Sequence, residues 1–333
     1  MTAGNGPNDL ERRLMQSTRI LLAALCAALL PATPALAQAY PAQPIKLVVP
    51  FPAGSATDSI ARLIGRDLQE TLGQPLVIEN KPGAQGVIGA EQVARATPDG
   101  YTLLITAVSF AATESLMKKL PYDVVRDFTP ISRIAITPLA LLVKPDFPAR
   151  TVREFISHLK ARAGKLSAGY GSSSAQVSIS QLRAMAGVDV LEVAYKGIPL
   201  AMNDVLAGNV EFSFVDLGNS IAQVKGGKLR ALAVTSEKRN PLVPDWPAMA
   251  ETLPGYDIDA WIATLGPRGL PREIAQRLHE ATQKVLARPD IEARLGTIGF
   301  SPAPLGPDRM PAFIKAEVDK WARLVRQAGI QPE

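Results

Sequence analysis

The sequence predicts an α/β protein with two lobes, each a mainly parallel sheet flanked by helices, and with two crossings of the chain between the lobes. Short apolar runs rich in β-branched residues alternate with helix-length amphipathic segments along most of the chain. This alternation is typical of strand–helix–strand units. The length of 333 residues, of which 47% are hydrophobic, is enough for about two domains with cores of their own.

The first 37 residues read as an export signal. Arg19 precedes the apolar run Ile20–Leu30, and the small residues Ala35–Ala37 offer a cleavage site. The apolar run is shorter than the roughly 20 residues that a membrane-spanning helix needs. We therefore predict that residues 1–37 are cleaved as a signal peptide and that Cys26, the single cysteine, leaves with them.

The first α/β series starts with the apolar run Ile45–Val49, which predicts a strand buried on both faces. Apolar residues then recur at helical spacing up to Leu72. Ser55 or Thr57 is available as the N-cap of this helix, and Gly73 stops it. The alternation continues with a strand at 76–78, a helix that ends near 96 and a strand at 101–106.

A second series follows the apolar run 139–143, and Thr151 with Glu154 forms a capping box for its first helix. A strand near Trp261 then leads into two amphipathic helices that need a sheet to cover. The predicted domains are residues 40–141 with 262–333 as lobe 1, and residues 142–261 as lobe 2. The further strands are predicted at 190–195, 210–215 and 229–235, and the two last helices at about 274–285 and 313–325.

Composition and motifs exclude several classes of function. The net charge of +5 comes from interspersed acidic and basic residues, so no nucleic-acid partner is predicted. One Cys and two His are too few for a zinc ribbon or a disulfide scaffold. Gly83, Gly86 and Gly89 match neither the dinucleotide fingerprint nor a phosphate-binding P-loop, and we predict no metal and no cofactor.

Ligands of an open α/β sheet bind beyond the carboxyl ends of the strands, in the strand-to-helix loops. Residues 50–58 form the first such loop. Gly54 permits a sharp turn there, and Ser55 and Thr57 precede a helix whose first N–H groups favour an anion such as a carboxylate. A capped helix without a ligand explains the same segment equally well.

Two more loops carry polar groups. Ser172, Ser173 and Ser174 precede a helix start, and one serine is enough for a cap, so the surplus hydroxyls favour a site. Tyr195, Lys196 and Gly197 follow a predicted strand, where the lysine offers charge and the tyrosine a wall with a hydroxyl. A simple cap, an exposed lysine and a packed tyrosine are the alternative interpretations.

Four other polar residues are interpreted as structural. Asp257 and Asp259 flank a strand entry, where paired carboxylates are expected to be solvated. His158 and His279 lie on predicted helices without a catalytic partner nearby in sequence, so we expect them at the surface. The sequence therefore shows no signature of an enzymatic nucleophile or base.

Several segments together resemble the Bug family of extracytoplasmic solute receptors, the binding components of tripartite tricarboxylate transporters. The resemblance covers nearly the whole chain after the predicted signal peptide. The segments that carry it are VVPFPAG (48–54), LGQPLVIENKPGAQGVIGA (72–90), PDGYTLL (98–104), LPYD (120–123), DFTPIS (127–132), YKG (195–197), GKLRALAVTS (227–236) and W-x-x-x-L-G-P (261–267).

The resemblance implies a two-lobed periplasmic binding protein that closes on a carboxylated solute and delivers it to membrane transporter subunits. It also implies a cleft lined by the first loop and by helix ends of both lobes. Two positions depart from the family pattern: Ser55 replaces a second glycine, and Gln176 replaces a histidine. The residues that match the family's cleft are Phe51, Ala53, Gly54, Ala56, Thr57, Asp58, Ser174, Lys196 and Gly197.

We therefore expect a periplasmic solute-binding receptor that acts as a monomer and is not an enzyme. Two alternatives remain open. The closed receptor can signal to a membrane sensor kinase instead of a permease, or the protein can be a periplasmic enzyme that uses Asp58 or Lys196 chemically.

Overall fold

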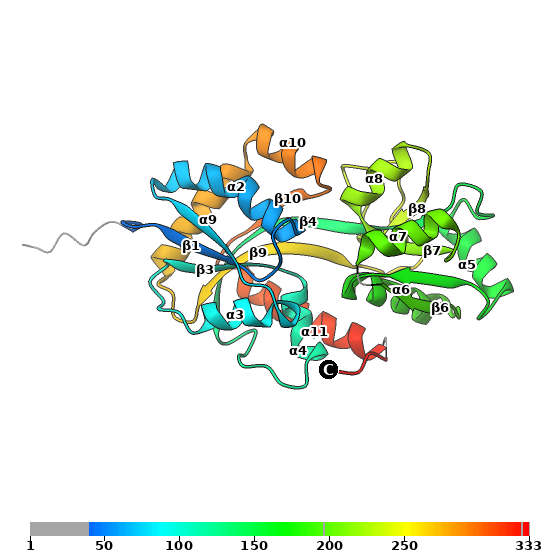
Figure 1. The fold of residues 1–333 in the computed structure, drawn as a ribbon, viewed down its shortest axis with the longest axis horizontal. Coiled ribbons are helices and arrows are strands. Elements are labelled where there is room, and N and C mark those ends of the chain that lie inside the picture. Colours follow the sequence, from blue (N-terminus) through cyan, green and yellow to red (C-terminus); the bar gives the residue numbers. More distant parts are fainter. Residues whose placement is uncertain (1–39, 196, 328, 333) are drawn as a thin grey trace, which may run out of the picture. The chain divides into compact units, whose positions relative to one another are not determined.

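Strands and helices alternate along the chain from Ile45 to Gln327 (Figure 1). The computed structural model describes residues 40–195, 197–327 and 329–332; the predicted signal peptide and Lys196 lie outside the described residues. The strands are β1 (Ile45–Val49), β2 (Leu76–Asn80), β3 (Thr102–Ala107), β4 (Phe128–Val143), β5 (Ser167–Tyr170), β6 (Leu191–Ala194), β7 (Phe212–Asp216), β8 (Arg230–Val234), β9 (Asp259–Pro267) and β10 (Ser301–Leu305). The helices are α2 (Ala56–Leu72), α3 (Val87–Ala94), α4 (Ser109–Leu116), α5 (Val152–Ala161), α6 (Ser173–Ala186), α7 (Ile198–Ala207), α8 (Leu217–Lys225), α9 (Arg272–Leu286), α10 (Pro289–Thr297) and α11 (Met310–Gln327), with short 3-10 turns η1 (Ala84–Gly86) and η2 (Met249–Glu251).

The strands form a mixed sheet in the order β2-β1-β3-β9-β4-β7-β5-β6, and β8 and β10 pair with β4. The outer strands are parallel, as the sequence predicts: β1 pairs with β2 and β3, and β5 pairs with β6 and β7. The central strands differ from that prediction, because β9 runs antiparallel to both β3 and β4. A chain that crosses out along β4 and back along β9 has to run in opposite directions on the two strands.

Strand β4 joins the two halves of the sheet. Phe128–Pro138 pairs with β9, and Leu139–Val143 pairs with β7. The sequence predicted only its last five residues as strand, because Pro130 and Pro138 interrupt the apolar pattern. The structure accommodates Pro130 beside a shift in the β4–β9 register, where a missing N–H costs little.

Helices cover both faces of the sheet. Around β1, β3 and β9, helices α2, α9 and α10 lie together on one face, and α3, α4 and α11 lie on the other (Figure 1). Ile60 and Ile64 of α2 are fully buried against the sheet, as the helical spacing in the sequence predicts. Helix α11 also contacts α6, so it packs against elements of both halves.

The helix starts are fixed by side chains that follow the strands. Ser55 caps α2 from an extended conformation (φ −65°, ψ 160°), and its Oγ accepts a hydrogen bond from Asp58 N. Ser172 caps α6 in the same way by accepting from Ala175 N. These two caps orient the free N–H groups of α2 and α6 beyond the carboxyl ends of β1 and β5.

Candidate functional site

A cavity of about 1050 Å³ lies beyond the carboxyl ends of four strands. The strands β1, β3, β5 and β7 each lead into a helix, and residues at the N-terminal ends of these four helices, α2, α4, α6 and α8, line the cavity. Helix N-termini carry unpaired N–H groups and partial positive charge. The cavity therefore offers an anion several sets of backbone donors at once.

The structure brings the first two predicted loops together at this cavity. The loop before α2 and the serine-rich start of α6 come from different halves of the sheet, more than a hundred residues apart in sequence. Among the sequence-predicted residues, those that line the cavity are Phe51, Gly54, Ser55, Ala56, Thr57, Ser172, Ser173 and Ser174.

Asp58 supports the first loop from behind instead of lining the cavity. The residue is 3% exposed, and its carboxylate accepts hydrogen bonds from Gly54 N (2.9 Å), Asn80 Nδ2 (2.9 Å) and Arg62 Nε (3.0 Å). Burial opposes ionisation, but the hydrogen bonds from Arg62, Gly54 and Asn80 outweigh it and lower the pKa of the carboxyl. Asn80 also donates to Phe51 O (3.1 Å), so the two side chains together fix the loop.

The three serines at the start of α6 have different surroundings. Ser172 Oγ accepts the capping hydrogen bond from Ala175 N (3.2 Å). Ser172 Oγ and Ser174 Oγ lie 3.2 Å apart, within hydrogen-bond distance of each other. The cap therefore depends on Ser172, whereas the hydroxyl of Ser174 is not part of it.

Of the third predicted loop, Tyr195–Gly197, the structure describes the first and last residues. Tyr195 OH donates to Asp204 Oδ2 (2.6 Å), and this hydrogen bond raises the pKa of Tyr195 to about 12. Gln176 Nε2 donates to Tyr170 OH (3.3 Å). Ala53, Gln176, Tyr195 and Gly197 are not among the residues that line the cavity, and Lys196 lies outside the described residues.

Sequence reasoning missed two further helix starts. Val108 and Ser109 follow β3, whereas Asp216 is the last residue of β7 and Asn219 lies in the first turn of α8; all four residues line the cavity. The rule that ligands bind beyond strand ends would have found both segments, because β3 and β7 were each predicted as strands. Trp321 of α11 also lines the cavity, and no local motif indicates it.

Charge in the cavity is sparse. The described lining residues include no Lys, Arg or His, and Asp216 is the one carboxylate among them. Asp216 caps α8: its Oδ1 accepts from Asn219 N (3.0 Å), and its Oδ2 accepts from Asn219 Nδ2 (2.8 Å). Among the described lining residues, the groups that can donate a hydrogen bond to an anion are amides and hydroxyls.

The structure corrects the sequence interpretation of His279. Its side chain is buried, at 8% exposure, and its Nδ1 lies 3.0 Å from Ser132 Oγ. Burial lowers the pKa of His279, because the charged ring loses water. Neither His279 nor Ser132 lines the cavity, so this pair is a packing feature of α9 against β4.

Asp259 is also less solvated than the sequence suggested. Its Oδ1 is buried without a hydrogen-bond partner among the residues that the structure describes. Burial and the nearby Asp257 raise the pKa of Asp259 to about 7. Asp257 itself is half-exposed and forms an ion pair with Lys320 Nζ (3.0 Å).

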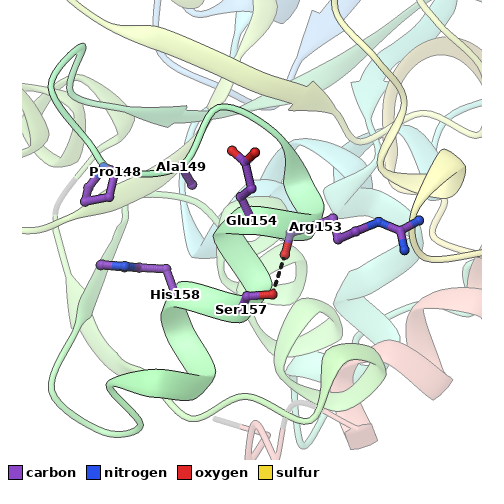
Figure 2. Close-up of a pocket in the computed structure, with 6 residues that line it drawn as sticks. All are labelled: Pro148, Ala149, Arg153, Glu154, Ser157 and His158. Atoms are coloured by element: carbon purple, nitrogen blue, oxygen red, sulfur yellow. Dashed lines mark hydrogen bonds between the residues drawn. The ribbon is translucent and has the colours of Figure 1, made fainter.

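A smaller hollow of about 360 Å³ lies on α5 (Figure 2). His158 lines it, but His158, Arg153 and Glu154 point away from one another, and Ser157 Oγ donates to Arg153 O (3.0 Å) (Figure 2). Its polar groups do not converge on one point, in contrast to the helix ends around the large cavity. We therefore assign it no site.

The described part of the chain holds neither a cluster of metal-ligating side chains nor a helix suited to span a membrane. Across residues 40–195, 197–327 and 329–332, no group of three or more His, Cys, Asp or Glu side chains is arranged to hold a metal ion. None of the described helices combines the length and the apolar character needed to cross a membrane.

Comparisons with known proteins agree in pointing to one family. Residues 60–330 match the family model described as the tripartite tricarboxylate transporter family receptor. The chain is 34% identical to protein BugT of Bordetella pertussis over 305 residues, which are 90% of this chain and 93% of BugT. It is similar to the structure of the periplasmic binding protein BugD, with 34% identity, a TM-score of 0.73 and coverage of 88% of this chain and 100% of BugD. It is also similar to Rpa4515 of R. palustris with adipate, with 34% identity, a TM-score of 0.76 and coverage of 88% and 100%.

Proposed function

Because the chain belongs to the receptor family of the tripartite tricarboxylate transporters, we propose that it captures a small carboxylated metabolite between two lobes and delivers it to the membrane subunits of such a transporter. The resemblance noted in the sequence is confirmed by this family match. The predicted fold class, a two-lobed periplasmic binding protein, is confirmed as well.

The observation that carries the proposal is the convergence of helix N-termini on one cavity. A micromolar solute needs about −8 kcal/mol. One helix-end charge interaction contributes about 0.3–1 kcal/mol, and one hydrogen bond to a charged group contributes about 1.5–3 kcal/mol. A single loop is thus too weak, whereas the starts of α2 and α6 together, with Ser55, Thr57 and Ser174, reach this range.

We place the two lobes at residues 40–141 with 262–333, and at residues 142–261. In support of this division, β4 changes its pairing partner from β9 to β7 between Pro138 and Leu139. Movement about these central strands would bring the starts of α2 and α6 together around a ligand. Closure would then be part of binding, because the ligand contacts both sets of donors only in the closed state.

The proposal includes export to the periplasm after cleavage of residues 1–37, and binding as a monomer without catalysis. The similarity to BugD, which is named a periplasmic binding protein, supports the location. The family match supports binding over catalysis, because the matched family is described as a transporter receptor family.

Isothermal titration calorimetry of ligand-stripped protein against di- and tricarboxylates, amino acids and aromatic acids tests the proposal. We expect at least one carboxylate to bind at micromolar concentration or below. Mass spectrometry after prolonged incubation should recover that carboxylate unchanged. If no member of the panel binds, the proposed function is wrong; if the bound compound is converted, the absence of catalysis is wrong.

A further inference from the structure

The turn η1, which follows β2, carries an unfavourable backbone beside the large cavity. Ala84 (φ 45°) and Gln85 (φ 55°) are the two residues other than glycine that have a left-handed backbone in the part of the chain that the structure describes. This region is unfavourable for a residue with a Cβ atom and open to glycine. Backbone strain of this kind is concentrated at functional sites, where the surrounding structure imposes it.

The packing of the turn against the first loop holds it in place. A Cβ atom added at Gly89 would meet Pro50 Cβ at 2.8 Å. One added at Gly86 would meet Pro50 Cβ at 3.4 Å and Phe51 Cζ at 3.7 Å. The glycine motif that matches no nucleotide-binding fingerprint thus brings this turn directly onto the loop that lines the cavity.

The side chain of Gln85 is available to a ligand. Gln85 is exposed and lines the cavity, whereas its neighbour Ala84 is not among the lining residues. The carboxamide is uncharged and offers two N–H donors and a carbonyl acceptor. Glycine would adopt the backbone of this position without strain, and an exposed side chain adds little to the core. The residue type is therefore better explained by a contact in the cavity than by the stability of the turn.

We propose that Gln85 is a ligand-selecting residue: its Nε2 donates a hydrogen bond to an oxygen of the bound acid other than the carboxylate held at the helix starts. The ligand is then a carboxylic acid with at least one further oxygen, in a hydroxyl, a carbonyl or a second carboxylate. This inference rests on the proposed function, because it names a contact within the same cavity. The strained turn is retained because it presents this side chain to the ligand.

Gln85→Gly removes the side chain and relieves the strain at the same position. We expect it to raise the folding equilibrium constant of the ligand-free protein about two- to fivefold, because glycine adopts the left-handed backbone freely. We also expect it to weaken the binding of an acid with a further oxygen at least fivefold, because a hydrogen bond is lost. Urea unfolding and calorimetric titration of the ligand-stripped, full mature chain measure the two quantities. A residue with a purely structural role would not combine a more stable fold with weaker binding.

Ala84→Gly is the matched control, because it relieves the neighbouring left-handed residue outside the cavity lining. It should raise the folding equilibrium constant similarly and change the dissociation constant by less than twofold. The probes are adipate, citrate, 2-hydroxyglutarate, glutamate and 3-phenyllactate, and the acid that binds the wild-type protein most tightly is used for every variant. If only another carboxylate of the wider panel binds, that compound is the probe.

Unchanged affinity in Gln85→Gly, or a loss that is equally large in Ala84→Gly, would overturn the role of Gln85 and leave the proposed receptor standing. If no carboxylate binds the wild-type protein, the proposed function fails together with this inference. The two failures are thus distinguished by the wild-type titration.

Gln85→Glu tests the direction of the hydrogen bond. A glutamate side chain has the same length as glutamine, but its ionised carboxylate only accepts hydrogen bonds. It also repels an acidic ligand, so we expect the affinity for the same probe to fall at least tenfold at pH 7.5. Because the strain of the backbone is the same in both proteins, the folding equilibrium constant should change by less than twofold. Unchanged or tighter binding would overturn the proposed donation by Nε2.

Discussion

At the residue scale, Ser172 and Ser174 are expected to affect different properties: Ser172 the stability of the fold, and Ser174 the affinity for the ligand. Both residues line the cavity, but Ser172 Oγ caps α6, whereas Ser174 Oγ lies 3.2 Å from it and takes no part in the cap. Capping hydroxyls contribute to the free energy of unfolding, whereas a hydroxyl that faces a ligand contributes to affinity. The same residue type, two positions apart, thus has two separable effects.

We predict that Ser172→Ala lowers the free energy of unfolding of the ligand-free protein by about 1 kcal/mol, because the cap is lost. Ser174→Ala should change that free energy by less than about 0.5 kcal/mol and weaken ligand affinity by about tenfold. Urea unfolding and calorimetric titration measure the two quantities. An equally large loss of stability in Ser174→Ala would mean that Ser174 has a structural role.

Asp259 provides a prediction about pH. Burial and the neighbouring Asp257 raise its pKa in the folded state to about 7, above the ordinary value of 3.8 for an aspartate. Because the unfolded chain ionises this group more easily, its contribution to stability is fully present below about pH 4 and is lost as the pH rises to about 7. Removing the charge should therefore raise the free energy of unfolding most at neutral and higher pH.

We expect Asp259→Asn to raise the free energy of unfolding by about 2–4 kcal/mol at pH 8, and by clearly less at pH 5. Urea unfolding of both proteins at the two pH values measures the difference. Asp245→Asn, an exposed position, is the control for loss of one negative charge. A gain for Asp259→Asn that is equal at both pH values would contradict the raised pKa.

At the scale of elements, the start of α8 lies directly against the turn between α10 and β10. A Cβ atom added at Gly218 would meet Ile298 O at 2.5 Å, and one added at Gly299 would meet Gly218 N at 2.1 Å. Helix α8 follows β7 in one half of the sheet, and the α10–β10 turn belongs to the other half. The two glycines therefore allow the two halves to approach at the cavity.

We predict that Gly218→Ala weakens ligand affinity at least tenfold, because the added methyl group keeps the α8 start away from Ile298. Gly218 is in a helical segment, so alanine fits its backbone, and the stability of the ligand-free protein should change by less than about 1 kcal/mol. Gly226→Ala, at the other end of α8, is the matched control for titration. Unchanged affinity in Gly218→Ala would show that the contact is not needed for binding.

The elements that the sequence predicted correctly are those with strong periodicity and clear caps. Helices α2 and α9 and strands β1 and β7 follow directly from apolar spacing. The first part of β4 was missed because its prolines obscure the pattern, and α4, α10, β5 and β10 were not predicted. Within the candidate site, the serine loops were found because hydroxyls at helix starts are visible in sequence. Trp321 was missed because only tertiary packing brings α11 to the cavity.

At the scale of the whole molecule, the proposed function requires that binding and lobe closure are one event. The donors of α2 and α6 belong to different halves of the mixed sheet, joined mainly through β4 and β9. A ligand that contacts both halves stabilises the closed state by its differential affinity for that state. It also raises the apparent stability, by about 2.7 kcal/mol when the free ligand is at one hundred times its dissociation constant.

Small-angle X-ray scattering measures this closure directly. We expect the radius of gyration of ligand-stripped protein to decrease when a saturating carboxylate from the titration panel is added. Gly218→Ala should show a smaller decrease at the same degree of saturation, because its halves cannot approach fully, and Gly226→Ala should behave like the wild-type protein. If scattering of the wild-type protein is identical with and without bound ligand, the halves do not move. Binding would then have to be explained by a rigid cavity, with the four helix starts already in place.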